Sequence, residues 1–172
     1  MIIVKSVISI AIICLSAYIG TYKSRKLKER ERVLIEMVTF LKLVKNEIKY
    51  MMNILPNAYE ISRQKLSTEL KIKIGQIVVD MLDSENLTYV EGSIEKNISE
   101  IECLEKYDKE VIISTLKNLG RSDIEGQINI IENTINILET QINEANEIKN
   151  TNSKLYRTIG IITGLMLVII FI

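Results

Sequence analysis

Histidine is absent from this chain of 172 residues, and so is tryptophan. Without histidine the chain lacks the commonest metal ligand, the usual general base and the partner that activates serine or cysteine nucleophiles. Neither GxxxxGK nor GxGxxG occurs, so no glycine-rich phosphate loop is predicted. These absences disfavour catalysis. We predict a protein that is not an enzyme and has no catalytic residue, cofactor, bound metal or small-molecule substrate.

Cysteine, proline and net charge are also in short supply. Cys14 and Cys103 are the two cysteines, and their separation excludes a CxxC metal motif and makes a disulfide implausible. Pro56 is the one proline. The 22 basic and 22 acidic side chains cancel, so the basic footprint of a nucleic-acid-binding protein is missing.

Carboxylates are plentiful and pairs of them can do acid–base chemistry. The stretch around residues 94–105 carries Ile94, Ile98, Ile101 and Leu104 at helical spacing. Charged residues on an amphipathic helix usually face water. We therefore interpret the neighbouring acids as a solvated helix face: Glu95, Glu100, Glu102 and Glu105.

Apolar residues gather at both ends of the chain. Met1–Gly20 contains a single charge, Lys5, and Ile159–Ile172 contains none. A membrane-spanning helix needs about 20 apolar residues. The sequence predicts transmembrane helices at 1–22 and 155–172, the second of borderline length, and a domain at 23–154 between them.

Basic residues flank the middle domain at both membrane edges: Lys23, Arg25, Lys26, Lys28, Arg30 and Arg32 on one side, and Lys149, Lys154 and Arg157 on the other. Flanks rich in Lys and Arg stay in the cytoplasm. We predict a cytoplasmic domain with both termini exterior. A cleaved signal peptide, the alternative for the first segment, would carry its basic residues before the apolar run.

Small residues four apart recur in both predicted spans, at Ser16 and Gly20 and at Gly160 and Gly164. Such pairs let helices approach closely in lipid. The two spans could pack on each other within one chain, or join chains into a homo-oligomer.

The middle domain has helical periodicity throughout. Expected helices run from Arg25 to about Met52, from near Leu55, from a cap at Ser67 or Thr68 to Leu82, from about Tyr89 to Tyr107, from Asp108 to Leu119, and from Ser122 onward. The fold class is therefore all-α: an antiparallel bundle of about six helices, flanked by N- and C-terminal transmembrane helices.

The sixth helix has the most regular pattern in the chain. Its apolar positions follow a near-heptad spacing, typical of helices packed at shallow angles: Ile124, Ile128, Ile131, Ile135, Leu138, Ile142, Ala145 and Ile148. This seam could face another protomer, but packing within the chain is the better prediction because other amphipathic helices are present. Thr151–Ser153 is a candidate hinge before the membrane.

The residues just before this helix form the sharpest local signal. Gly120 suits the left-handed position that ends a helix, and Ser122 with Glu125 predicts a capping box that starts the next. Asp123 adds a negative charge at the helix N-terminus. This corner is either a purely structural reversal or a partner contact. The predicted structural or interaction motif is Gly120, Ser122, Asp123, Glu125 and Gln127.

The order of these motifs resembles the stage III sporulation protein AB family of endospore-forming bacteria. The resemblance covers nearly the whole chain and is weakest over Lys65–Tyr107. It is carried near the start by Glu47, Ile48, Tyr50, Leu55, Pro56 and Ala58, and near the end by Leu119, Gly120, Ser122, Asp123, Gln127, Ala145, Leu155, Tyr156, Arg157, Gly160 and Gly164.

The resemblance implies a non-enzymatic membrane platform in the apparatus that joins the mother cell to the forespore. Its location would be the mother-cell membrane. Its soluble domain would be similar to the inner-membrane platform domain of type II secretion and type IV pilus machines. It would then dock a cytoplasmic secretion-type ATPase, stage III sporulation protein AA, and other membrane proteins of the apparatus. Alternatives are a platform in a secretion or pilus machine itself, or a membrane-tethered helical sensor or regulator.

Overall fold

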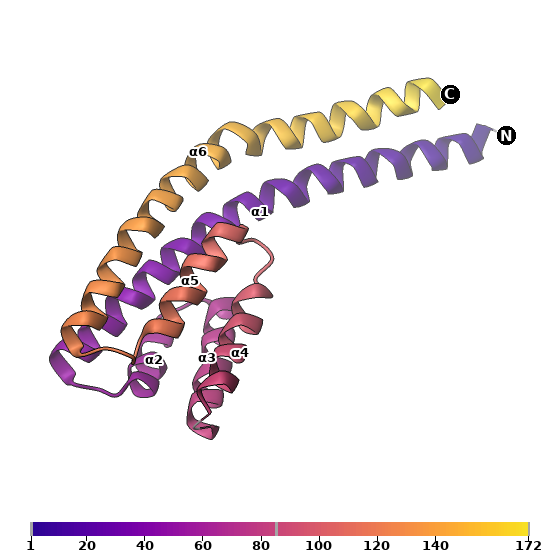
Figure 1. Ribbon diagram of the computed structural model, residues 1–172. Coiled ribbons are helices and arrows are strands. Elements are labelled where there is room, and N and C mark those ends of the chain that lie inside the picture. Colours follow the sequence, from indigo (N-terminus) through magenta and orange to yellow (C-terminus); the bar gives the residue numbers. More distant parts are fainter. Residues whose placement is uncertain (1, 85, 172) are drawn as a thin grey trace. The chain divides into compact units, whose positions relative to one another are not determined.

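The computed structural model describes the backbone of residues 2–84 and 86–171. It describes the side chains of residues 21–67, 69–84 and 86–152, together with a few side chains before residue 21 and after residue 152. Within this part the chain forms helices and no strand (Figure 1). The helices are α1 (Ile2–Met51), α2 (Leu55–Arg63), α3 (Thr68–Asp83), α4 (Leu87–Ser99), α5 (Lys106–Asn118) and α6 (Ile124–Phe171). The prediction of an all-helical bundle is confirmed.

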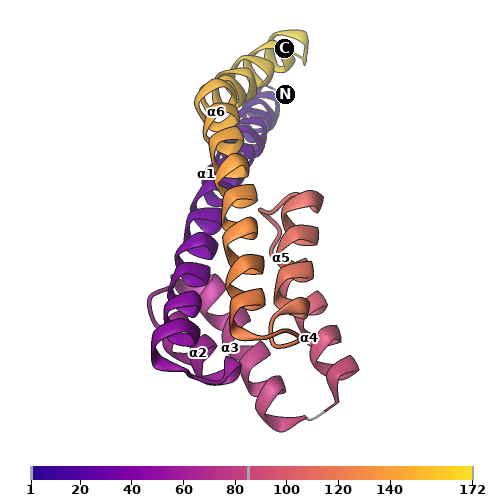
Figure 2. The ribbon, with the colours of Figure 1, turned by 60° about the vertical axis from the view of Figure 1, so that its left-hand side comes forward.

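The chain divides into two compact units. The first consists of residues 1–31 and 143–172, where the beginning of α1 and the end of α6 lie side by side (Figures 1 and 2). In this unit Lys149 donates to the Glu31 carboxylate across 2.7 Å. The buried guanidinium of Arg30 lies 3.9 Å from the Glu144 carboxylate.

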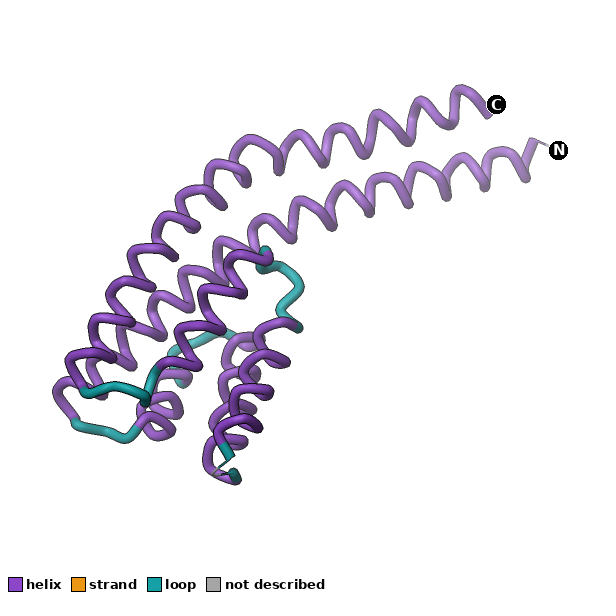
Figure 3. The backbone as a smooth tube through the Cα atoms, viewed as in Figure 1, coloured by secondary structure: helices purple, strands orange, loops and turns teal. Residues whose placement is uncertain are grey.

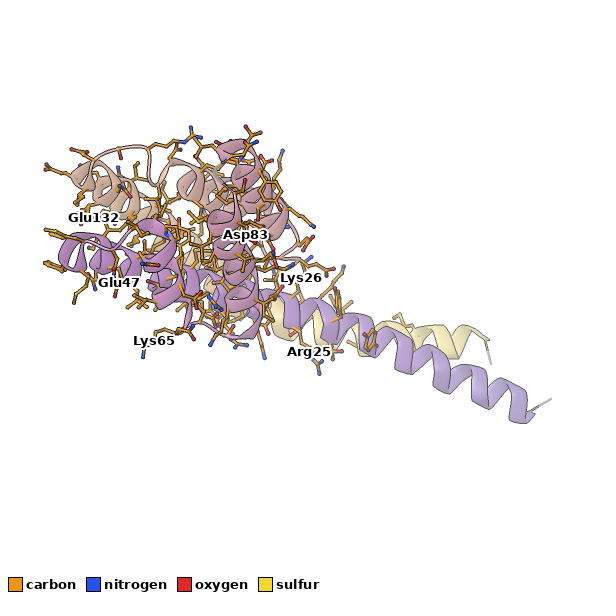
Figure 4. The ribbon with its side chains drawn as sticks, turned by 90° about the horizontal axis from the view of Figure 1, so that it is seen from below. Arg25, Lys26, Glu47, Lys65, Asp83 and Glu132 are labelled. Atoms are coloured by element: carbon orange, nitrogen blue, oxygen red, sulfur yellow. The ribbon has the colours of Figure 1, made fainter. Side chains whose placement is uncertain are left out.

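The second unit, residues 32–142, contains the helical bundle. Helix α3 packs against α2 and α4, and α4 packs against α5. Charged side chains such as Glu47, Lys65 and Asp83 surround the bundle (Figure 4). Fully buried side chains from α1 to α6 form its core, among them Leu34, Met37, Phe40, Leu41, Tyr59, Leu70, Ile74, Ile77, Ile98, Ile112, Ile131 and Leu138.

The predicted seam of α6 faces inward within a single chain. Ile131, Ile135 and Leu138 are buried, whereas Ile124 at the start of the helix is exposed. Two ion pairs join α6 to α1 in the bundle: Lys42 with Glu139 at 3.0 Å and Lys45 with Glu132 at 3.3 Å. The seam therefore joins helices of one chain, as predicted.

Helix α1 ends in a left-handed turn. Met52 has a φ of 51°, a conformation usually taken by glycine, and the Asn53 N–H donates to the Glu47 carbonyl across 3.2 Å. Pro56 then occupies the first turn of α2, where its missing N–H has no helical partner to lose. Met51, expected on the buried stripe, is exposed because the helix stops there.

One sequence expectation in the helical part was wrong. The helix expected over Tyr89–Tyr107 ends at Ser99, and a new helix, α5, starts at Lys106, where Asp108 accepts the Glu105 N–H at 2.9 Å. The backbone of Thr151–Ser153 is helical within α6, and a hinge there stays a prediction. A run of Thr, Asn and Ser is only slightly unfavourable in a helix and does not by itself end one.

The predicted spans, 1–22 and 155–172, are helical where the backbone is described. Over the residues that the structure describes, no helix is long and apolar enough to cross a membrane. The packing positions Ser16, Gly20, Gly160 and Gly164 lie outside the described side chains. The transmembrane helices stay a prediction from sequence.

Candidate functional site

The predicted corner between α5 and α6 lies at the end of the bundle where α1 also passes into α2 (Figure 3). Gly120 has a φ of 85°, the left-handed conformation expected after a helix end. A methyl group at Gly120 would lie 3.4 Å from Cδ2 of Leu55, the first residue of α2. The corner is thus packed against the start of α2, and the positive φ of Gly120 favours glycine there.

Asp123, and not Ser122, caps α6. The Asp123 carboxylate accepts the Gly126 N–H at 3.0 Å, and its carbonyl accepts the Gln127 N–H at 3.0 Å. The predicted capping box of Ser122 and Glu125 was therefore wrong by one residue. Gly126 is needed for this cap, because a Cβ there would come within 2.8 Å of both the Asp123 carboxylate and the Ser122 hydroxyl.

Gln127 holds the corner closed. Its side-chain oxygen accepts the Gly120 N–H at 3.2 Å, and its amide nitrogen donates to the Ser122 carbonyl at 3.0 Å. One side chain thus satisfies two backbone groups that the reversal leaves without helical partners. The sequence placed Gln127 in the motif by resemblance alone and gave no reason for it.

Replacement of Asp123 with alanine is expected to lower the free energy of unfolding by about 1 kcal/mol, the usual effect of losing an N-cap. Ser122→Ala is the matched control and should lower it by less than half as much. Urea unfolding followed by circular dichroism measures both. A larger loss for Ser122→Ala than for Asp123→Ala would contradict the assignment of the cap.

Two grooves flank the corner. The first, called the apolar groove, has a volume of about 610 Å³ and reaches Gly120 and Arg121. Apolar side chains from α2, α3, α4 and α5 dominate its lining: Leu55, Met81, Leu87, Val90, Ile94, Leu116 and Leu119. The second groove, of about 830 Å³, lies between Lys49 and the beginning of α6, where it is lined by Asp123, Ile124, Glu125 and Ile128.

Ion pairs between α4 and α5 border the apolar groove. Arg121 bonds the Glu91 carboxylate, and Lys117 lies 2.8 Å from the Glu95 carboxylate. Arg121, Glu91 and Lys117 also line the groove. The pairs hold α4 beside the end of α5, and each is partly exposed, so their contribution to stability is small. Their effect is to leave a polar border around an apolar surface.

Leu87, which lines this groove at the start of α4, is 68% exposed. Other large apolar side chains are exposed at helix ends but do not line the groove: Met51 ends α1, Met52 and Ile54 follow it, and Leu82 lies near the end of α3. Met52 also has the left-handed backbone noted above, which is uncommon for a residue with a side chain. An exposed apolar area with a polar border is typical of a protein-interaction surface.

Sequence comparison places the chain in a known family. The profile of the stage III sporulation protein AB family matches residues 5–172. The chain belongs to this family. No curated protein and no solved structure matches the chain.

Membership in the stage III sporulation protein AB family gives the chain a role in sporulation. The expected similarity of the bundle to a secretion-platform domain is not shown and stays a prediction. In the described part of this family member, no group of three His, Cys, Asp or Glu side chains is placed to hold a metal ion.

The five predicted corner residues adjoin: Gly120, Ser122 and Asp123 lie in the turn between α5 and α6, and Glu125 and Gln127 lie in the first turn of α6. Hydrogen bonds of Asp123 and Gln127 hold this turn. The apolar groove beside them was missed. Leu87, which lines it at the start of α4, had not been singled out. Leu82 and Met51 had been expected on buried stripes and are exposed, although they do not line the groove. The available signal was position: each of the three lies at or next to a helix end, where the stripe is no longer covered by the neighbouring helix.

Proposed function

We propose that this protein is a non-enzymatic scaffold of the apparatus joining mother cell and forespore, and that the end of its bundle docks the cytoplasmic ATPase of the apparatus, stage III sporulation protein AA. The apolar groove beside the corner is the observation that carries this proposal. Leu87 in its lining is mostly exposed and so contributes little to the packing of the bundle, and Met81 also lines it. Methionine suits a docking surface because its flexible, polarisable side chain adapts to the partner.

The charges near the groove support a partner with basic residues around an apolar segment. Asp83, Asp123 and Glu125 lie at this end of the bundle on α3 and at the corner. The basic residues bordering the groove, Arg121 and Lys117, are already paired with Glu91 and Glu95. Complementary charge at the rim would orient the partner and raise its association rate.

We further propose that both ends of the chain anchor it in the mother-cell membrane, with the bundle in the cytoplasm. The support comes from sequence: apolar runs at both termini, with basic residues next to them on the side of the bundle. Other membrane proteins of the apparatus are then natural partners of the spans.

The docking proposal is tested with the full-length protein and the purified ATPase. Leu87→Asp and Val90→Asp, both in the lining of the groove, are expected to weaken binding at least tenfold, since a charge in an apolar contact must be desolvated without a partner. Ile72→Asp is the matched control: Ile72 of α3 is 65% exposed, close to the 68% of Leu87, but it does not line the groove. It should leave binding unchanged.

Equal loss with Ile72→Asp, or no loss with either groove variant, would contradict docking at this surface. Crosslinking in sporulating cells, with vegetative cells as the control, tests the wider proposal. Recovery of the ATPase from the membrane fraction of sporulating cells alone is the expected result. Recovery of secretion or pilus components from growing cells would instead assign the scaffold to another machine.

A further inference from the structure

A third groove, of about 610 Å³, lies between α3 and α4, away from the corner, and is called here the polar groove. Its lining includes Gln76 and Asp80 of α3, and Tyr89, Gly92, Ser93 and Asn97 of α4. None of these residues belongs to the apolar groove described above. Its chemistry is different, because its lining consists largely of hydrogen-bonding groups.

Asp80 provides the negative charge of this groove. Its carboxylate accepts hydrogen bonds from the Ser93 hydroxyl, from the Gln76 amide at 3.3 Å and, more weakly, from the Tyr89 hydroxyl at 3.5 Å. These donors are all neutral. Within the described part of the chain, no ion pair to Asp80 is present, so its charge is positioned but not neutralised.

Asn97 and Ser93 present further polar atoms although both are more than nine-tenths buried. The Asn97 amide nitrogen donates to the Ser93 carbonyl at 3.0 Å and to the Ser93 hydroxyl at 3.2 Å. In the described part of the chain these two bonds use only the donor end of the amide. Asn97 lines the groove, and its carbonyl oxygen is left as an acceptor.

Gly92 keeps the groove open. It lies inside helix α4, where glycine is about 1 kcal/mol less favourable than alanine. Its φ is not positive, and a Cβ built there meets no atom within 4 Å. Neither backbone conformation nor internal packing therefore requires a glycine. What its missing side chain provides is access to the groove next to Asp80 and Ser93.

The charges around Asp80 favour the binding of a cation at its carboxylate. Lys73 bonds the Glu100 carboxylate, and this hydrogen bond lowers the pKa of Glu100, so these two charges offset each other. Lys96 adds a positive charge at the rim, but its side chain is exposed and its field is screened by water. Asp80 is half-buried, so water screens its charge less than that of Lys96.

We propose that the polar groove binds an arginine side chain of a protein partner, with Asp80 as its carboxylate acceptor. A guanidinium is planar and has five N–H donors, which match the carboxylate oxygens of Asp80, once it displaces the weak Tyr89 hydrogen bond, and the amide oxygen of Asn97. A lysine ammonium offers a point charge and cannot pair with a carboxylate in the same bidentate geometry. This site is separate from the proposed ATPase surface and does not depend on it.

The test uses isotope-labelled full-length protein and amide NMR spectra. The probe is an acetylated, amidated Gly-Arg-Gly peptide, and the control replaces arginine with citrulline, which has nearly the same shape and no charge. The arginine peptide should shift the Gly92 amide and the side-chain amides of Gln76 and Asn97, and should bind at least tenfold more tightly than the citrulline peptide. Equal binding of the two peptides, or shifts confined to other surfaces, would overturn the proposal.

Variants of the protein test the groove residues themselves, with the same arginine peptide as the probe. Asp80→Asn keeps the shape of the side chain and should weaken arginine-peptide binding at least tenfold, whereas Asp83→Asn, on the same helix but outside the groove, should not. Gly92→Leu should block the groove without strain in the helix, and Gly92→Ala should raise the melting temperature. Unchanged binding in Asp80→Asn or Gly92→Leu would overturn the proposal, as would tighter binding of free spermidine than of the arginine peptide.

Discussion

Replacement of Ile135 with aspartate is expected to lower the free energy of unfolding by about 3–5 kcal/mol, enough to unfold many domains of this size. Ile135 is 6% exposed and lies on the seam of α6. A carboxylate there would be buried among apolar side chains with no new partner, so it would be desolvated without compensation. Thermal and urea unfolding measure the loss.

Ile137→Asp is the matched control, with the same chemical change on the same helix. Ile137 is 38% exposed, so its carboxylate would reach water and the expected loss is below 1 kcal/mol. If both variants unfolded at the same denaturant concentration as the original protein, the seam would have to face outward, toward another protomer.

Phe40→Ala has the second large expected effect, a loss of about 3–5 kcal/mol. Phe40 of α1 is fully buried, and its ring meets that of Tyr59 of α2 edge to face, with 5.1 Å between the ring centroids and 70° between the planes. Truncation would leave a cavity between these helices and remove the aromatic contact. Because α2 is a short helix, its attachment to α1 depends strongly on this contact.

The Tyr59→Phe variant distinguishes the effect of the ring contact on stability from the effect of the buried hydroxyl. In the described part of the chain the buried Tyr59 hydroxyl has no hydrogen-bond partner, and burial raises the pKa of its phenol. Removing the hydroxyl keeps the ring pair and removes an unsatisfied polar atom, so stability should rise by about 1 kcal/mol. Differential scanning calorimetry of the two variants should show shifts of opposite sign. A loss in Tyr59→Phe would mean that the hydroxyl is satisfied in solution.

Helical periodicity predicted most of the bundle because its core is built from regular apolar stripes. It failed over Tyr89–Tyr107 for a specific reason. Ile94, Ile98, Ile101 and Leu104 are all buried, yet only the first two belong to α4. The turn after Ser99 places the other two against the core at the same spacing, so an apolar pattern continues where the helix does not.

The corner shows a different limit. Both Ser122 and Asp123 are good N-cap residues. Glu125, three residues after Ser122, completes a capping-box pattern, whereas Gly126, three residues after Asp123, has no side chain to do so. The local pattern therefore favoured the wrong cap. The choice depends on Gln127, whose side chain fixes Gly120 and Ser122 on the far side of the turn. That contact joins residues that a local capping rule does not consider.

The candidate docking surface could not be predicted because exposure at a helix end is a tertiary property. Leu82 continues the apolar stripe of α3 and Met51 that of α1, and each looks like a core position in sequence. Their helices end before a neighbour covers them. Only the positions of the adjacent helices distinguish such a residue from Ile77 or Val44, which are buried.

The packing between α1 and α6 also determines how the bundle carries load. Buried side chains hold the two antiparallel helices in one register, and the exposed ion pairs of Lys42 with Glu139 and Lys45 with Glu132 match that register. Sliding one helix along the other by a single turn, about 5.4 Å, would part both pairs and displace buried side chains such as Leu41 and Leu138. A force along the axis of either helix is therefore transmitted to the other. The two helices move together, and the bundle resists sliding of one long helix along the other.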